Sequence, residues 1–195
     1  MHLVPLPALA DNYIWLLHDG ADALVVDPGD ADVVRGAVRE GGLTLRGIFL
    51  THHHQDHVGG VAGLLADRPV PVYAPDDERI DSTTCVVGDG DIIETRLPLA
   101  KFSVIGVAGH TRSHVAYFGE GALFCGDTLF SLGCGRMFEG GPGQMLAALD
   151  RLRRLPPTTQ VCAGHEYTAA NGSFADTVDP DNAALRERRR EVDQL

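Results

Sequence analysis

Residues 47–60 read GIFLTHHHQDHVGG and form the most informative stretch of this chain. The apolar run Gly47–Leu50 predicts a buried strand, and Val58–Gly60 predicts the start of a helix. Between them lie four side chains that can bind a metal ion, His52, His54, Asp56 and His57. If this loop is extended, the first three of them point to the same side, because side chains alternate along an extended chain.

Three more candidate ligands repeat this arrangement further along the chain: His110, Asp127 and His165. Each follows a short apolar run and stands beside a glycine, which lets the backbone turn sharply where a strand ends. Imidazole nitrogens and carboxylate oxygens together suit zinc or a similar divalent ion. The seven side chains are enough to hold two metal ions that share one carboxylate.

The composition is that of one globular domain. The chain has 195 residues, of which 44% are hydrophobic, and no apolar run approaches the roughly 18 residues of a membrane span. The start MHLVP lacks the basic and apolar regions of a signal peptide, so we expect a cytoplasmic protein. A net charge of -11 disfavours binding to nucleic acid or to an anionic membrane.

The four cysteines show no CxxC spacing, so a disulfide framework is not expected. Cys125 and Cys162 fall inside apolar runs and are predicted to be small core residues. Cys134 lies in a glycine-rich segment near the candidate site, without a pattern that would activate its thiol.

Strand and helix patterns alternate along the chain. Strands are predicted at residues 13–18, 23–26 and 70–74, short strands and turns at 86–124, and helices at 30–40, 58–66, 143–155 and 183–192. In the helix at 143–155 five apolar residues recur at helical spacing and are predicted to face the core: Met145, Leu146, Leu149, Leu152 and Leu155. This order of elements predicts a sheet-on-sheet core with helices outside.

The segment HxHxDH, followed by His, Asp and His after successive strands, resembles the metallo-β-lactamase superfamily. Within it the chain is similar to the glyoxalase II family. The segments GCGRMFEG at residues 133–140 and GHEYT at 164–168 are the ones that point to that family. The resemblance covers about the first 170 residues and implies an αββα sandwich, in the α/β (α+β) class, over residues 1–168, with a short helical C-terminal segment at 169–195.

The resemblance also implies a division of the ligands between two metals. One would be held by His52, His54 and His110, the other by Asp56, His57 and His165, with Asp127 as the bridge. Zinc is the expected metal, with iron and manganese open. His114 is expected beside the ligands, not among them.

The activity implied by the resemblance is hydrolysis of a glutathione thioester, S-D-lactoylglutathione, to D-lactate and glutathione. Two divalent ions acidify a shared water toward neutral pKa, which supplies a hydroxide nucleophile. Asp56 and Asp127 are the expected catalytic residues, and Arg136, Phe138 and Tyr167 the expected substrate contacts. A guanidinium such as that of Arg136 is suited to bind a carboxylate with two hydrogen bonds. We expect a monomer.

The chain departs from this family after Tyr167. Relatives continue into a longer helical domain with further basic contacts to glutathione, whereas only residues 169–195 remain here, so the chain is either naturally short or truncated. The arginines between 186 and 190 are predicted to form a solvated helix face. Three alternatives stay open: a mononuclear-iron persulfide dioxygenase, a lactonase or nuclease of the same fold, and a non-catalytic metal-binding or interaction module.

Overall fold

The computed structural model describes residues 1–194, which form two main sheets with helices on their outer faces. The first sheet has the order β1 (His2–Ala8), β2 (Asn12–His18), β3 (Asp22–Val26), β4 (Thr44–Phe49), β5 (Val72–Pro75) and β6 (Cys85–Val87). The second has the order β13 (Gln160–Ala163), β10 (Ala122–Gly126), β9 (Val115–Gly119), β8 (Leu99–Gly106) and β7 (Ile92–Arg96). A small ribbon pairs β11 (Leu129–Phe130) with β12 (Gly133–Cys134).

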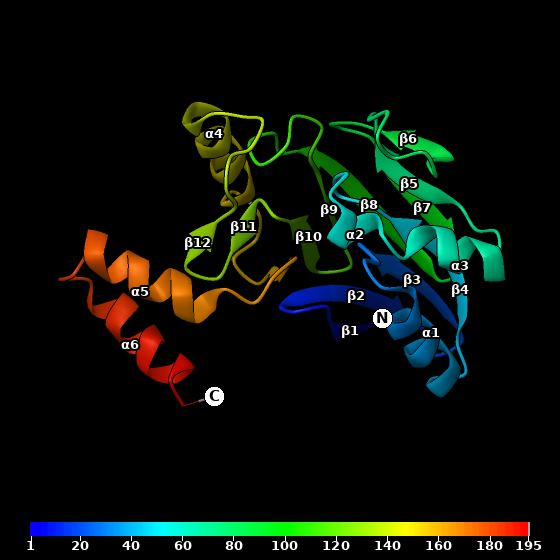
Figure 1. Cartoon of the computed structure of the whole chain (residues 1–195), viewed down its shortest axis with the longest axis horizontal. Helices are drawn as coiled ribbons and strands as arrows, with labels where there is room; N and C mark the ends of the chain where they lie inside the picture. Colours follow the sequence, from blue (N-terminus) through cyan, green and yellow to red (C-terminus); the bar gives the residue numbers. More distant parts are fainter. Residues whose placement is uncertain (195) are drawn as a thin grey trace.

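The helices are α1 (Ala31–Glu40), α2 (Gln55–Val58), α3 (Val61–Asp67), α4 (Pro142–Leu152), α5 (Thr168–Val178) and α6 (Ala183–Val192). In Figure 1, α1 to α3 lie beside the first sheet and α4 beside the second. Three apolar clusters fill the layers: one between α1, α3 and the first sheet, one between the sheets, and one between α4 and the second sheet. The expected αββα sandwich is therefore confirmed.

The strand directions bring several strand ends to one edge of the sandwich. β3 runs parallel to β4, so the segments that follow them, beginning at Asp27 and Leu50, leave the sheet at the same end. β10 runs parallel to β13, which does the same for Asp127 and His165. An isolated bridge between Asn12 and His165 joins the loops of the two sheets. Polar residues far apart in the sequence are thus gathered at this edge.

Some details differ from the predictions. The helix expected at 143–155 is α4, which ends at Leu152 and leaves Leu155 outside it. In place of the single helix expected at 58–66 there are two helices. The first, α2, already begins at Gln55, and Gly59 and Gly60 separate it from α3. Asp56 and His57 consequently sit on a helical turn, and the alternation of an extended loop ends at His54. In α4, Leu146 is 62% exposed, while Ala148 takes the expected place of a core residue.

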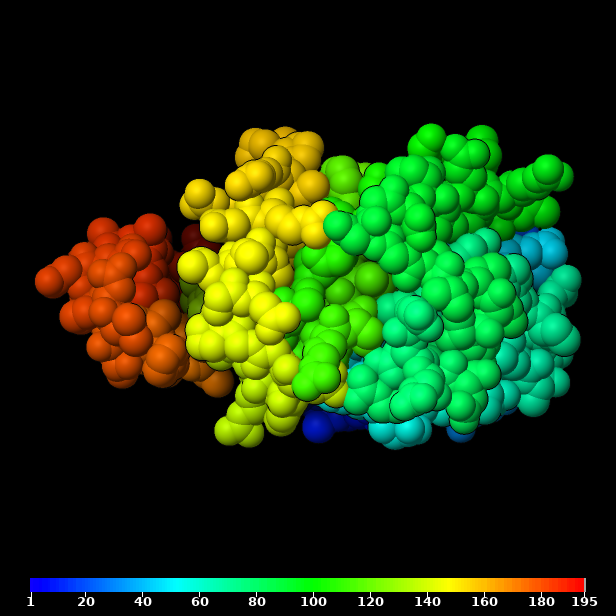
Figure 2. All heavy atoms as spheres, turned by 90° about the horizontal axis from the view of Figure 1, so that it is seen from above, coloured from blue at the N-terminus to red at the C-terminus, as the bar shows by residue number. Residues whose placement is uncertain are grey.

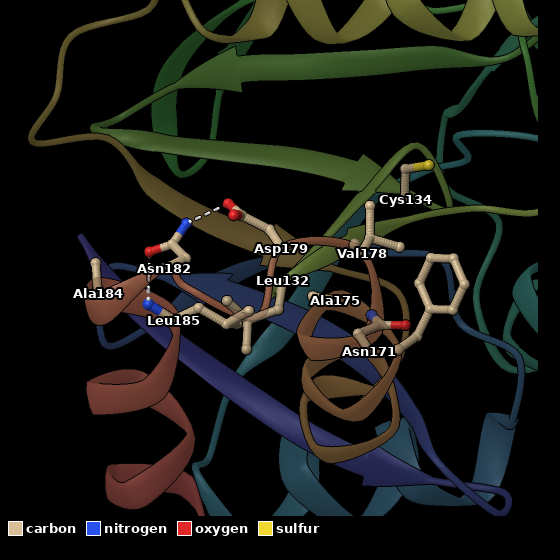
Figure 3. A pocket seen from close by; sticks show the side chains of 11 residues that line it. Leu132, Cys134, Asn171, Ala175, Val178, Asp179, Asn182, Ala184 and Leu185 are labelled. Atoms are coloured by element: carbon tan, nitrogen blue, oxygen red, sulfur yellow. Dashed lines mark hydrogen bonds between the residues drawn. The ribbon is translucent and has the colours of Figure 1, made fainter.

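The last two helices, α5 and α6, project from one end of the molecule (Figures 1 and 2). A groove of about 600 Å³ lies between them and the β11–β12 ribbon, and it is lined by Leu132, Cys134 and Leu185 among others (Figure 3). Within residues 1–194, no helix combines the length and the apolar character that a membrane crossing requires.

Candidate metal centre

The seven candidate ligands meet at the loop-bearing edge of the sandwich. Three of them, His52, His54 and His110, converge as one group, and Asp56, His57 and His165 as a second. In the first group, Nδ1 of His54 lies 3.1 Å from Nε2 of His52 and 3.0 Å from Nε2 of His110. In the second group, Oδ2 of Asp56 lies 3.3 Å from Nε2 of His165 and 3.5 Å from Nε2 of His57.

Asp127 lies between the two groups. Its Oδ1 is 3.3 Å from Nε2 of His57, and its Oδ2 is 3.3 Å from Nε2 of His165. The same Oδ2 is 3.4 Å from Nε2 of His110, which belongs to the first group. A single carboxylate therefore lies close to ligands of both groups.

In four of the imidazole rings, Nδ1 lies within hydrogen-bonding distance of an oxygen atom, and this contact fixes the orientation of the ring. Nδ1 of His110 donates to the carbonyl of Arg136 at 2.6 Å, which leaves Nε2 as the ring's lone-pair nitrogen. Nδ1 of His57 lies 3.0 Å from Oδ2 of Asp27, and Nδ1 of His165 lies 2.7 Å from Oδ1 of Asp11. Nδ1 of His52 lies 3.0 Å from the hydroxyl of Thr51, which donates to Asp27. Such partners orient metal-binding histidines in proteins.

Sequence reasoning did not assign these supporting residues a role. Asp27 accepts the backbone N–H of Thr51 at 2.8 Å as well as the contacts above, and Asn12 donates to Oδ2 of Asp56 at 3.0 Å. Asp11, Asn12 and Asp27 lie within the part of the chain that resembles the family, and each stands at or near the end of a predicted strand. That position was the signal in the sequence that could have indicated a supporting role.

The residues fit a metal ion. Nε2 of His57 and Oδ1 of Asp127 are both buried, and neither has a hydrogen-bond partner among residues 1–194. Buried polar atoms are nearly always paired in proteins, so this edge lacks a group that would satisfy them. A divalent ion does so for a cluster of imidazole nitrogens and carboxylate oxygens. The centre and its fold therefore support the binding of divalent metal ions.

The two groups differ in their affinity for protons. Burial lowers the pKa of His52, His54 and His110, so these rings are neutral around pH 7. Burial alone would also lower the pKa of His165, but the carboxylates of Asp127 and Asp56 raise it to about 10. The hydrogen bond with His165 in turn lowers the pKa of Asp56. Metal binding to the second group therefore has to displace a proton.

The three expected substrate contacts border this centre. The Phe138 ring is 61% exposed and lies 5.6 Å from the His54 ring, and the Arg136 guanidinium lies 5.8 Å from the Phe138 ring. Tyr167 stacks on His165 with the ring centres 4.9 Å apart. One aromatic ring thus flanks each group of ligands.

His114 lies beside the ligands, as expected. Its ring stacks on His52 at 4.6 Å, and its Nε2 accepts the backbone N–H of Asp127 at 3.3 Å. Its Nδ1 lies 3.2 Å from the carbonyl of Val115, so both ring nitrogens are already engaged with the protein. His114 therefore helps to hold the chain at Asp127.

The chain is similar to known proteins over nearly all its length. The family described as "Metallo-beta-lactamase superfamily" matches residues 9–165. A hydroxyacylglutathione hydrolase of Xanthomonas campestris pv. campestris (strain B100) is 56% identical over 198 residues, which cover 100% of this chain and 76% of the relative.

Two solved structures are also similar to this chain in sequence and fold. A B3 metallo-beta-lactamase, BLEG-1, is 26% identical with a TM-score of 0.77, over 85% of this chain and 92% of that one. TTHA1623, solved in a di-iron-bound form, is 28% identical with a TM-score of 0.70, over 85% of this chain and 92% of that one. The chain belongs to the metallo-beta-lactamase superfamily and, within it, to the hydroxyacylglutathione hydrolase family.

Proposed function

We propose that this protein hydrolyses glutathione thioesters, with S-D-lactoylglutathione, cleaved to D-lactate and glutathione, as the preferred substrate. The relative of 56% identity that carries the name hydroxyacylglutathione hydrolase supports the substrate class. The observation that carries the reaction type is the placement of Asp127, whose two carboxylate oxygens face both groups of candidate ligands. A carboxylate shared in this way is typical of two-metal hydrolytic sites.

In this proposal His52, His54 and His110 would hold one divalent ion, Asp56, His57 and His165 would hold the other, and Asp127 would be shared between the two. When bound, such a pair of ions lowers the pKa of a water molecule toward neutrality and polarises a carbonyl. Zinc suits the nitrogen-rich donor set. Iron is supported by the di-iron form of TTHA1623, and manganese would suit the carboxylate oxygens.

The protein's own residues would keep this centre in place and bind the substrate. Asn12 holds the Asp56 carboxylate on the side of His165, and Asp27 holds His57 toward Asp127. Arg136, exposed on its loop, would bind a carboxylate of the glutathione moiety. Phe138 and Tyr167 would line the sides of the same site, because their rings flank the two groups of histidines.

A substrate panel tests this proposal directly. We expect the zinc-loaded protein to contain close to two metal equivalents and to hydrolyse S-D-lactoylglutathione faster than a simple lactone or a β-lactam. Equal or faster hydrolysis of the lactone would reassign the protein as a lactonase. Oxygen consumption with glutathione persulfide by an iron-loaded form holding one metal would reassign it as a dioxygenase. Bound metal without turnover of any ester or thioester would identify a binding module.

The remaining expectations stay predictions. We infer a division near residue 168, since α5 contacts α6 and β12, and both helices lie outside residues 9–165, which match the superfamily. A monomeric state, a cytoplasmic location and the lack of nucleic-acid or membrane partners are also predictions. Sedimentation of the metal-loaded protein would test the first of these.

A further inference from the structure

A second polar cluster lies next to the metal centre and encloses His53, the one histidine of the segment 51–57 that neither metal group uses. Arg79 binds Asp77 with two parallel hydrogen bonds, both 2.7 Å, and also donates to the carboxylate of Glu139. His53 lies between the two acids, with Nδ1 3.5 Å from Asp77 and Nε2 3.7 Å from Glu139. The Asp77 side chain is only 4% exposed, so its charge needs these partners.

This cluster connects segments from distant parts of the chain. His53 belongs to the metal loop, residues 51–57, and the Asp77–Arg79 segment follows β5. Ser113 donates to Asp77 at 2.6 Å, and the backbone N–H of Arg112 donates to Glu139 at 2.9 Å. Hydrogen bonds from Arg79 and from the Arg112 backbone lower the pKa of Glu139 to about 2, so this acid is charged at neutral pH.

Glu139 lies at the end of the substrate loop, which we define as residues 136–140. This loop wraps around His110: the backbone N–H of Phe138 donates to the His110 carbonyl at 3.1 Å, and His110 donates to the Arg136 carbonyl at 2.6 Å. The outward side chains of the loop are largely exposed, with Phe138 61% and Met137 40% accessible. Among the side chains of this loop, Glu139 is the one with charge-assisted bonds to the rest of the protein.

We propose that Asp77, Arg79 and Glu139 are positioning residues that hold the substrate loop against the metal loop and thereby set the affinity for the substrate. This inference rests on the proposed function, because it takes Arg136 and Phe138 as substrate contacts. The hydrogen bonds and ion pairs of these three side chains involve none of the seven candidate ligands, so their effect on the chemical step is expected to be small. Loss of the Glu139 charge alone should change folding little, because the Arg79–Glu139 pair is partly exposed to solvent and Arg79 keeps its bonds to Asp77.

The test compares Glu139→Gln, Arg79→Ala, their double variant and the conservative Arg79→Lys. Arg151→Ala is the matched control, because Arg151 is 44% exposed, close to the 46% of Arg79, and pairs with Asp89 away from the centre. Each metal-loaded variant is measured for metal content, for kcat and KM with S-D-lactoylglutathione, and for hydrogen exchange of the amides of residues 137–140.

We expect Glu139→Gln and Arg79→Ala to raise KM on the order of tenfold, the scale of a lost charge-assisted hydrogen bond, with kcat within about twofold and metal content unchanged. The double variant should resemble Arg79→Ala, since that change already removes the Arg79–Glu139 pair together with the two bonds from Arg79 to Asp77. Arg79→Lys should restore part of the affinity. Amides of the substrate loop should exchange faster in the Glu139 and Arg79 variants and at the wild-type rate in Arg151→Ala.

Unchanged KM in both single variants, or a parallel loss of metal and kcat, would overturn the inference in favour of a purely structural role. If the wild-type protein hydrolyses no glutathione thioester, the proposed function fails by itself. Hydrogen exchange then decides the positioning role: faster exchange of the loop amides at intact metal content supports it, and unchanged exchange overturns it.

Discussion

Gly164 lies so close to Asp127 that any side chain at position 164 would clash with the Asp127 carboxylate. A β-carbon built there would be 2.6 Å from Oδ1 of Asp127 and 2.8 Å from Cε1 of His57, well inside any normal contact. The glycine therefore allows the bridging carboxylate and a ligand of the second group to approach each other. The observed positions of Asp127 and His57 therefore require glycine at position 164.

The first prediction follows from that contact. Gly164→Ala must displace Asp127 or His57, so we expect metal affinity to fall by about ten- to a hundredfold, the range known for disturbed metal surroundings, with kcat falling alongside. Gly36→Ala is the control: Gly36 lies inside α1, and a β-carbon there meets no atom of the described residues within 4 Å. That change should raise the free energy of unfolding by about 0.5–1 kcal/mol and leave metal content unchanged. Wild-type metal content in Gly164→Ala, measured by elemental analysis, would contradict the prediction.

A second prediction concerns the bridge itself. Asp127→Ala removes the one carboxylate that faces both groups, so metal content should fall below one equivalent and kcat should fall with it. His54→Ala removes a ligand of the first group only, so about one equivalent should remain at the second group. Elemental analysis after dialysis separates the two results. Equal losses in both variants would argue against two distinct groups.

A third prediction uses the cysteines. Burial raises the pKa of both Cys125 and Cys162 to about 12, so at pH 8 only about one thiol in ten thousand of each is ionised. Thiolates are the reactive form, and Cys134 is exposed while Cys85 is partly so. Iodoacetamide at pH 8 should therefore modify Cys134 and Cys85 in the folded protein, and the other two only after unfolding. Mass spectrometry of tryptic peptides measures this, and early labelling of Cys125 would show that its strand opens.

The sequence could predict the seven candidate ligands because four lie within six residues and the others repeat one local pattern at strand ends. It could not predict their supporting partners in the same way. Asp11 and His165 are separated by 154 positions, and Arg79 and Glu139 by 60, so only the folded chain brings them together. Their identities alone are those of ordinary polar loop residues.

The break between α2 and α3 has a similar cause. A β-carbon at Gly60 would lie 2.5 Å from the carbonyl of Pro28, and one at Gly59 would lie 2.9 Å from that of Gly29. The two glycines thus allow the loop after β3 to pack against the start of α3, which holds Asp27 beside His57. Helical periodicity cannot reveal such an approach, because it depends on a segment about 30 residues earlier in the chain.

The last prediction separates substrate binding from catalysis at Arg136. The guanidinium is exposed beside the Phe138 ring and Arg136 is not one of the seven candidate ligands, so Arg136→Ala should leave metal content intact. Loss of a charge-assisted hydrogen bond costs about 1.5–3 kcal/mol, so kcat/KM for S-D-lactoylglutathione should fall on the order of ten- to a hundredfold, mainly through KM.

The control for Arg136→Ala is a thioester of N-acetylcysteamine, which lacks the carboxylates of glutathione. If Arg136 acts by binding such a carboxylate, the variant and the wild-type protein should hydrolyse this short thioester with equal kcat/KM. Steady-state assays of both proteins on both substrates measure the difference directly. An equal loss on the two substrates would mean that Arg136 supports the loop or the centre instead, and no loss on either would mean that glutathione is bound by other residues.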